Sequence, residues 1–177
     1  MVLGIVLVLA GIILVFLAVV SFQSDQFKIS RSTLISAPAS VVFARVNDFH
    51  QWADWSPWEK LDPDMKKTFE GPKSGEGAIY RWTGNQKIGE GCMTITESRP
   101  DLIKLRLDFL KPFAATNEVE FAFKSEGEKT EVSWSMSGRK NFMFKTVHLF
   151  MNMDKMIGGE YEKGLEALKS LSETEKK

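Results

Sequence analysis

The stretch ISAPASVVFARVNDFHQWADWSPW, residues 35–58, decides the fold. Pro38 suits the first turn of a helix, and the valines and the phenylalanine that follow are spaced to form one buried face. Phe49, Trp52 and Trp55 then fall at three-residue spacing on a second short helical segment, so their rings share a side. Three of the five Trp residues of the chain lie in this stretch. Rings of this size either fill a core or line a pocket.

Length and composition limit what this stretch can belong to. A chain of 177 residues is long enough for one folded domain with an appendage. Lys plus Arg and Asp plus Glu both number 23, so the excess of positive charge typical of nucleic-acid binding is missing. We therefore expect no nucleic-acid partner. Cys92 is the single cysteine, so no intramolecular disulfide forms and the core must hold the fold.

The appendage is the N-terminal segment 1–22, which contains no charged side chain. A helix of this length, rising about 1.5 Å per residue, matches a hydrocarbon core of roughly 30 Å. A cleaved signal peptide is the alternative, with Val19–Ser21 as a small-residue site, but no Lys or Arg precedes the apolar run. The sequence thus favours a single-pass transmembrane anchor, followed by a linker at 23–26. Lys28 and Arg31 after the span favour a cytoplasmic domain by the positive-inside rule.

The rest of the chain alternates between apolar and polar residues in short segments divided by turn residues. Strands are predicted at residues 27–35, 67–70, 78–82, 87–96, 103–109, 118–124 and 131–137. The last two should form a hairpin. The pattern indicates an antiparallel sheet with one buried and one solvated face.

The periodicity then changes to about 3.6 residues, which predicts a long amphipathic helix over residues 153–171. Gly158 and Gly159 lower helix propensity there, so a bend or a close backbone contact is expected. His148 is expected to open this helix, and the charged tail 172–177 is expected to fray.

This order gives an α+β domain, residues 27–171, in which one helix covers the apolar face of a curved sheet. The motifs that carry a resemblance are Ile35-x-Ala37-Pro38-x-x-Val41-x-Phe43-x-x-Val46-x-Asp48-Phe49-x-x-Trp52, Gly75-x-Gly77-Ala78-x-Tyr80-x-Trp82 and Glu162-x-Gly164-Leu165-x-x-Leu168-Lys169. The soluble part resembles the START-like (SRPBCC) superfamily, and within it the polyketide cyclase/dehydrase and lipid transport group. The resemblance implies a helix-grip fold, with the sheet wrapped around the terminal helix and a hydrophobic cavity between them.

The residues give little material for catalysis or metal binding. No Ser or Cys motif accompanies His50 or His148, so no catalytic residue is assigned. Cys92 has no second Cys or His at ligand spacing, so neither a metal nor a cofactor is expected. The glycines of residues 71–77 precede a strand and are interpreted as turn residues. The acidic residues of 54–64 do not have the spacing of a calcium loop and are interpreted as solvated.

The candidate ligand-binding residues are the large apolar side chains that would meet between sheet and helix. They are Trp52, Trp55, Trp58, Tyr80, Trp82, Phe109, Phe121, Trp134, Met136, Met153, Ile157 and Tyr161. The residues alone favour a filled core, because a domain of this size needs the apolar area for stability. When the resemblance is added, a cavity and a filled core are about equally favoured. Polar groups such as Tyr80, Tyr161, Arg81 or Asn117 would then orient a ligand, and Trp58 is expected nearest its entrance.

The leading hypothesis is a membrane-anchored domain that binds or transports a hydrophobic small molecule or lipid taken from the adjacent bilayer. One alternative is an enzyme, a polyketide cyclase or dehydratase, in which a Tyr or Arg polarises a carbonyl. Another is a non-catalytic scaffold or stress-response module whose partner docks on exposed Trp side chains. A void of roughly 300 Å³ with a mouth would favour binding over a packed core.

Overall fold

The computed structural model describes residues 2–174, except for the side chain of His148. The elements follow one another as α1 (Val2–Ser21), β1 (Gln26–Ile35), α2 (Ala39–Asn47), the 3-10 turn η1 (Phe49–Gln51), α3 (Trp52–Trp55), the 3-10 turn η2 (Pro57–Lys60), β2 (Lys66–Glu70), β3 (Ile79–Thr83), β4 (Glu90–Arg99), β5 (Leu102–Lys111), β6 (Ala115–Glu126), β7 (Lys129–Arg139), α4 (Phe142–Phe150) and α5 (Met153–Thr174).

The strands form a seven-stranded sheet in the order β1-β7-β6-β5-β4-β3-β2, and every neighbouring pair is antiparallel. The predicted strands are confirmed, and so is the hairpin of β6 and β7, in which Phe121 lies opposite Trp134. Along β5 the residues Ile103, Leu105 and Leu107 are buried while Arg106 between them is exposed. This alternation gives the sheet one apolar face, which must be covered.

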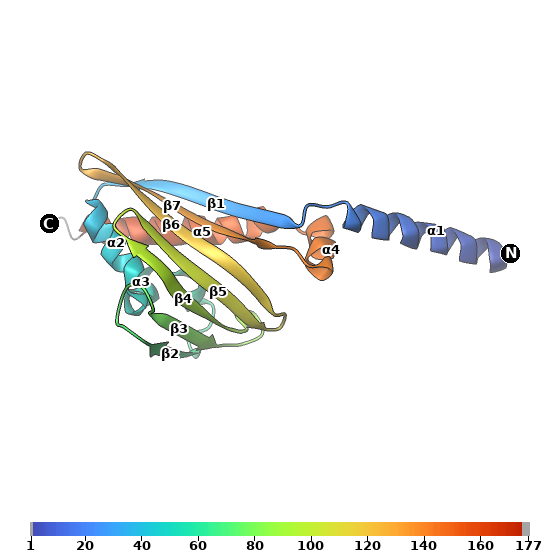
Figure 1. Ribbon diagram of the computed structural model, residues 1–177, viewed down its shortest axis with the longest axis horizontal. Coiled ribbons are helices and arrows are strands. Elements are labelled where there is room, and N and C mark those ends of the chain that lie inside the picture. The colour runs from blue at the N-terminus through green and yellow to red at the C-terminus, as the bar shows by residue number, and fades with distance from the viewer. Residues whose placement is uncertain (1, 175–177) are drawn as a thin grey trace.

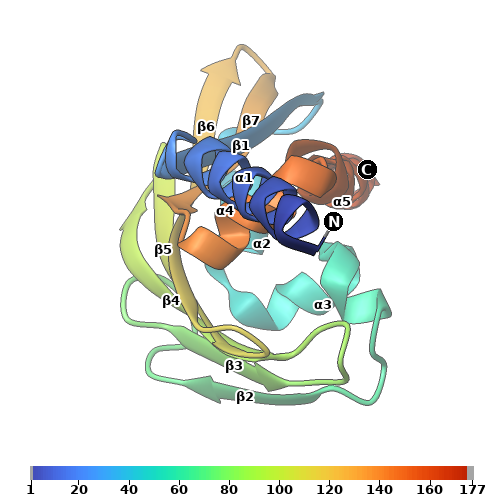
Figure 2. The same ribbon diagram turned by 90° about the vertical axis from the view of Figure 1, so that its right-hand side faces the viewer.

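Helices cover that face. Figure 2 shows the sheet curved around one side of α5, with α2 and α3 on the same side. Tyr161, Leu165 and Leu168 of α5 are buried in the core between helix and sheet. This arrangement is the helix-grip fold that the resemblance implies, and it confirms the expected α+β domain.

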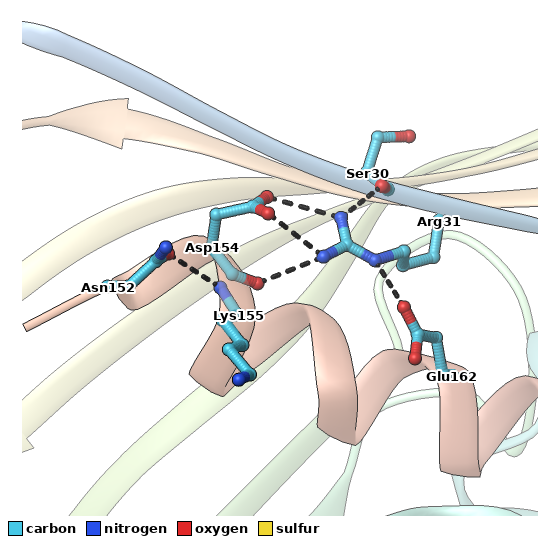
Figure 3. A network of polar contacts seen from close by, with 6 residues as sticks. All are labelled: Ser30, Arg31, Asn152, Asp154, Lys155 and Glu162. Atoms are coloured by element: carbon cyan, nitrogen blue, oxygen red, sulfur yellow. Dashed lines mark hydrogen bonds and ion pairs between the residues drawn. The ribbon is translucent and has the colours of Figure 1, made fainter.

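Polar contacts fix α5 along β1 (Figure 3). Arg31 of β1 donates from Nε to Oε1 of Glu162 at 2.7 Å and from Nη2 to Oδ2 of Asp154 at 3.0 Å. The guanidinium lies against the backbone of Gly158, where an added Cβ would be 2.1 Å from Nη2. The close backbone contact expected at the paired glycines is thus found at Gly158, and α5 continues through both of them.

The segment from α2 to η2 closes one end of the sheet. Asp48 caps η1 by accepting a hydrogen bond from the backbone N–H of His50 at 3.0 Å. Trp52 donates from Nε1 to the carbonyl oxygen of Val46 at 2.9 Å, which ties α3 back to α2. Trp52 and Trp55 are consequently turned into the core, where both are buried.

Two predictions about the C-terminal region were wrong. His148 does not open the terminal helix, because it lies in the separate helix α4, whose N-terminus is capped by Asn141. Asn152 caps the following helix by accepting from the N–H of Lys155 at 2.9 Å, so α5 begins after a break. The expected tail 172–177 begins inside α5, with Ser172 buried, while residues 175–177 lie outside the described part of the chain.

Helix α1 projects from the domain as an apolar rod (Figure 1). Its length and composition are sufficient for a membrane span, and a signal sequence would have the same properties.

Candidate functional site

The interior between α5, the sheet and η2 contains a cavity of about 170 Å³. It is lined by Trp52, Ser56, Trp58, Glu59, Met65, Tyr80, Trp82, Ile88, Met93, Leu107, Phe109, Val119, Trp134, Met136, Ile157 and Tyr161. The volume is below the roughly 300 Å³ of a site for a drug-sized ligand. It is comparable to an apolar cavity of about 150 Å³ that is known in another protein to hold benzene. The space therefore suits one aromatic ring or a short chain.

Stacked rings form one wall of the cavity. The rings of Trp134 and Tyr161 lie parallel, with centroids 4.1 Å apart and 8° between their planes. Trp58 meets both rings edge-on, at 5.5 Å from Trp134 and 5.8 Å from Tyr161. Gly164 allows this packing, because a Cβ there would lie 2.8 Å from the Trp134 ring. Such contacts hold the wall in one geometry.

A carboxylate lies within the otherwise apolar lining. The side chain of Glu59 is only 8% exposed, and its Oε1 accepts a hydrogen bond from the Tyr80 hydroxyl at 2.7 Å. Its other oxygen pairs with Lys67. Burial, followed by the hydrogen bond and the charge of Glu59, raises the pKa of Tyr80 far above its usual value. Tyr80 therefore stays a neutral donor engaged with Glu59.

Two further donors of the lining lack a protein partner. Trp134 Nε1 is buried and has no hydrogen-bond acceptor among the described residues. No described residue exchanges a hydrogen bond with the hydroxyl of Tyr161, a residue that is 2% exposed, but this oxygen, unlike Trp134 Nε1, is not one of the fully buried unpartnered atoms. Burial raises the pKa of Tyr161, so this hydroxyl also keeps its proton. An unpaired buried donor is costly, and an acceptor on a ligand would remove that cost.

The lining is not equally buried on all sides. Trp58, Ile88, Met93, Phe109 and Ile157 are half-buried, whereas the other apolar and aromatic residues of the lining are buried. These five come from η2, the β3–β4 loop, β4, β5 and the first part of α5. The cavity therefore approaches the protein surface on this side.

The sequence matches the family model described as polyketide cyclase / dehydrase and lipid transport over residues 26–173. The chain belongs to this family. A comparison with curated protein sequences finds no match.

Solved structures of low sequence identity have the same fold. The Zhui aromatase/cyclase from Streptomyces sp. R1128 superposes with a TM-score of 0.61 at 13% identity, covering 86% of this chain and 96% of its own. The Aha1 dimer from Colwellia psychrerythraea superposes with a TM-score of 0.59 at 14% identity, covering 83% of this chain and 96% of its own. A START superfamily protein from Mycobacterium smegmatis superposes with a TM-score of 0.57 at 15% identity, covering 83% of this chain and 97% of its own. At these identities the likeness establishes the START-like fold alone.

In this member of the polyketide cyclase/dehydrase and lipid transport family, the cavity brings together most of the candidate residues. Those in the lining are Trp52, Trp58, Tyr80, Trp82, Phe109, Trp134, Met136, Ile157 and Tyr161. Trp55, Phe121 and Met153 are buried outside the lining. Trp55 packs edge-on against Phe121 at 6.0 Å, so these two rings fill the core behind the wall.

Sequence reasoning misplaced three polar residues. Glu59 is not solvated, because η2 turns it toward Tyr80. Arg81 does not face the cavity: it lies on the outer face of the sheet and pairs with Glu70 at 2.8 Å. The alternation of β3 already implied this, since its neighbours Tyr80 and Trp82 face inward. Asn117 is buried but lines a separate hollow beside Phe27.

The apolar residues that the sequence missed are Met65, Ile88, Met93, Leu107 and Val119. Their apolar character gave no signal that separates a cavity wall from a core. Among the described residues, no group of three or more His, Cys, Asp or Glu side chains is placed to hold a metal ion.

Proposed function

We propose that the protein binds a small hydrophobic molecule, or the apolar end of a lipid, in the cavity between α5 and the sheet. The observation that supports this most directly is an apolar space of about 170 Å³ whose lining holds the buried, unpartnered Nε1 of Trp134 and a Tyr161 hydroxyl with no hydrogen-bond partner among the described residues. A core that served stability alone would gain from filling this space, since each void in a core is destabilising.

The chemistry of the lining favours a neutral ligand with one hydrogen-bond acceptor. The only acid of the lining, Glu59, already pairs with Tyr80 and Lys67. A ligand carbonyl or ether oxygen would accept from Tyr161 or Trp134, while its ring or chain replaces water against the aromatic walls. The hydrocarbon chain of a longer ligand would extend out of the cavity past the half-buried residues of the lining.

Helix α1 is proposed to anchor the domain in the membrane from which such a ligand is taken. Its apolar length supports a span, and tethering raises the concentration of the domain next to lipid. Lys28 and Arg31 after the helix favour a cytoplasmic location.

A cyclase or dehydratase is the second candidate function. The family model supports it, and Glu59, with a side chain 8% exposed and paired with Tyr80, is an acid–base group in the lining. The scaffold alternative required exposed Trp side chains, and Trp52 and Trp55 are 3% and 1% exposed.

A pair of probes tests the binding proposal. Full-length protein in mild detergent, freed of lipid, is titrated with acetophenone and with ethylbenzene while Trp fluorescence is recorded. Both should quench saturably, because Trp residues line the cavity, and acetophenone should bind more tightly because of its carbonyl oxygen. Native mass spectrometry should show a co-purifying molecule before lipid removal. If neither probe saturates and no molecule co-purifies, the proposal fails.

A further inference from the structure

Helix α4 exposes an apolar stripe that no described part of the protein covers. The stripe consists of Phe142, Met143, Leu149 and Phe150, whose side chains are 53%, 52%, 39% and 77% exposed. Their spacing along the helix places them on one side. Soluble surfaces rarely carry large apolar side chains in such a group, so the stripe indicates a contact with something apolar.

The opposite side of α4 fixes the helix to the domain. The ring of Phe144 packs on Phe27 of β1 at 5.4 Å. Lys145 is buried and forms an ion pair with Asp25, in the segment that joins α1 to β1. The stripe is therefore held outward by packing and charge on the other face.

The same contacts place α4 at the end of α1. Helix α1 contacts α4, and Gln23 donates a hydrogen bond from Nε2 to the carbonyl oxygen of Lys145 at 3.2 Å. The backbone N–H of Lys140 donates to the carbonyl oxygen of Asp25 at 2.8 Å. Figure 1 shows α4 beside the point where α1 meets the domain. If α1 crosses a bilayer and ends at Ser21, α4 lies at the boundary between that bilayer and water.

The turn between β5 and β6 is a second element with exposed apolar side chains. Leu110 and Phe113 at the turn between β5 and β6 are 50% and 61% exposed. Figure 1 places this turn on the side of the domain from which α1 leaves, and Figure 2 shows it at a distance from α4 across that side. The charges around α4 also suit a lipid surface, because Arg139 before the helix and Lys155 after it are exposed and can reach phosphate groups.

We infer that α4 and the β5–β6 turn dock on the bilayer that α1 spans, with the apolar stripe at the boundary between headgroups and acyl chains. The inference rests on the proposed membrane span of α1. A helix lying in the membrane plane turns its apolar side to the acyl chains, and in α4 the other side is occupied by the domain through Phe144 and Lys145. The chemistry that recognises the surface is lipid, with acyl chains for the stripe and phosphate for the flanking cations.

Docking would bring the cavity next to the lipid. The half-buried lining residues Phe109 and Ile157 belong to β5 near its turn and to the start of α5 just after α4. The side on which the cavity approaches the surface is thus close to the proposed docking face. A ligand leaving the bilayer there would have a short path through water.

The test uses full-length protein with Cys92→Ser and one added cysteine, in nanodiscs of phosphatidylcholine and phosphatidylglycerol with one copy per disc. The label is an environment-sensitive nitrobenzoxadiazole dye at Phe150→Cys or Phe113→Cys. Leu34→Cys is the matched control, because Leu34 is 40% exposed but lies at the far end of β1 from α1. Emission from positions 150 and 113 should shift to the blue and be lost with doxyl-labelled lipids, whereas that from position 34 should respond only to aqueous iodide.

Iodide quenching of position 150 equal to that of position 34, with no effect of doxyl lipid, would overturn the inference. A blue shift that requires two copies per disc would also overturn it, in favour of a second copy as the partner. Acetophenone binding, measured on the same discs, separates the two proposals. Lipid quenching without probe uptake removes the ligand proposal alone, and release of the protein by alkaline carbonate without lipid quenching removes both the anchor and the docking.

Discussion

Tyr80 and Tyr161 line the same cavity but differ in what their hydroxyls contact. Tyr80 donates to the buried carboxylate of Glu59, while the Tyr161 hydroxyl has no partner among the described residues. Removing the Tyr80 hydroxyl should therefore lower the free energy of unfolding by about 1–3 kcal/mol, because it leaves a buried acceptor less satisfied. Removing the Tyr161 hydroxyl should leave stability unchanged or slightly higher, since the ring still stacks on Trp134.

The Tyr161 hydroxyl should matter for ligand binding although it matters little for stability. Tyr161→Phe should weaken acetophenone binding by about 0.5–1.5 kcal/mol, up to roughly tenfold, and leave ethylbenzene binding unchanged. Urea unfolding and Trp quenching of the two variants, Tyr80→Phe and Tyr161→Phe, check both statements. If Tyr161→Phe weakened the binding of acetophenone and ethylbenzene equally, the Tyr161 hydroxyl would not donate a hydrogen bond to the acetophenone carbonyl.

At this scale the sequence predicted the rings but not their polar partners. Tyr80 and Trp82 follow from alternation along β3, and Trp52 from its spacing after Phe49. Glu59 was missed because a 3-10 turn of four residues has no periodicity that shows which way a side chain points. The position of Glu59 depends on where η2 meets β2 and β3, which is a tertiary feature.

At the scale of elements, the contact between β1 and α5 depends on Arg31, which bonds to α5 (Figure 3) and lies against Gly158. Asp154 and Glu162 hold the guanidinium, and any Cβ at Gly158 would occupy its place. The neighbouring Gly159 has no heavy atom within 4 Å of a built Cβ. The two glycines of α5 therefore have different roles although they are adjacent.

Alanine at each glycine distinguishes these roles. Gly159→Ala should raise the free energy of unfolding by up to about 1 kcal/mol, the usual gain in helix propensity. Gly158→Ala should gain less or be destabilising, because the flexible Arg31 must move and lose exposed ion pairs that contribute about 0–1 kcal/mol each. In an Arg31→Ala background the two changes should agree within about 0.5 kcal/mol. Thermal and urea unfolding of the five variants measures this; a difference that persists without Arg31 would contradict the explanation.

Helix α4 is the element that the sequence did not predict as a separate helix. Its residues FMFKTVHLF are apolar on more than one side, because one side meets β1 and the other is exposed. This segment has only nine residues, and α5 begins three residues after it ends, so the sequence pattern does not separate it from the start of the next helix. The strands and the long helix α5 were predictable because their alternation and 3.6-residue period extend over many residues, whereas the order of the strands in the sheet was not predicted.

For the whole molecule, the question that the sequence left open was whether the interior is filled. Composition alone cannot answer it, because the same Trp, Met and Val residues serve a core or a wall. The arrangement contains both: Trp55 and Phe121 fill the space behind Trp134, while a void remains in front of it. The void lies between α5 and the strands β3 to β7, so it depends on how the sheet curves around the helix, which is a tertiary feature.

Two buried valines on adjacent strands test this division. Val119 of β6 lines the cavity, and Val132 of β7 is in the core without lining it. Val119→Phe should place its ring in the void, so stability should hold or rise while acetophenone binding is lost. Val132→Phe should cost about 1–3 kcal/mol through overpacking but leave probe binding in the folded protein intact. Urea unfolding and Trp quenching on both variants give the comparison. If Val119→Phe destabilises as much as Val132→Phe, the space in front of Trp134 is not available to a ligand, and the binding proposal loses its basis.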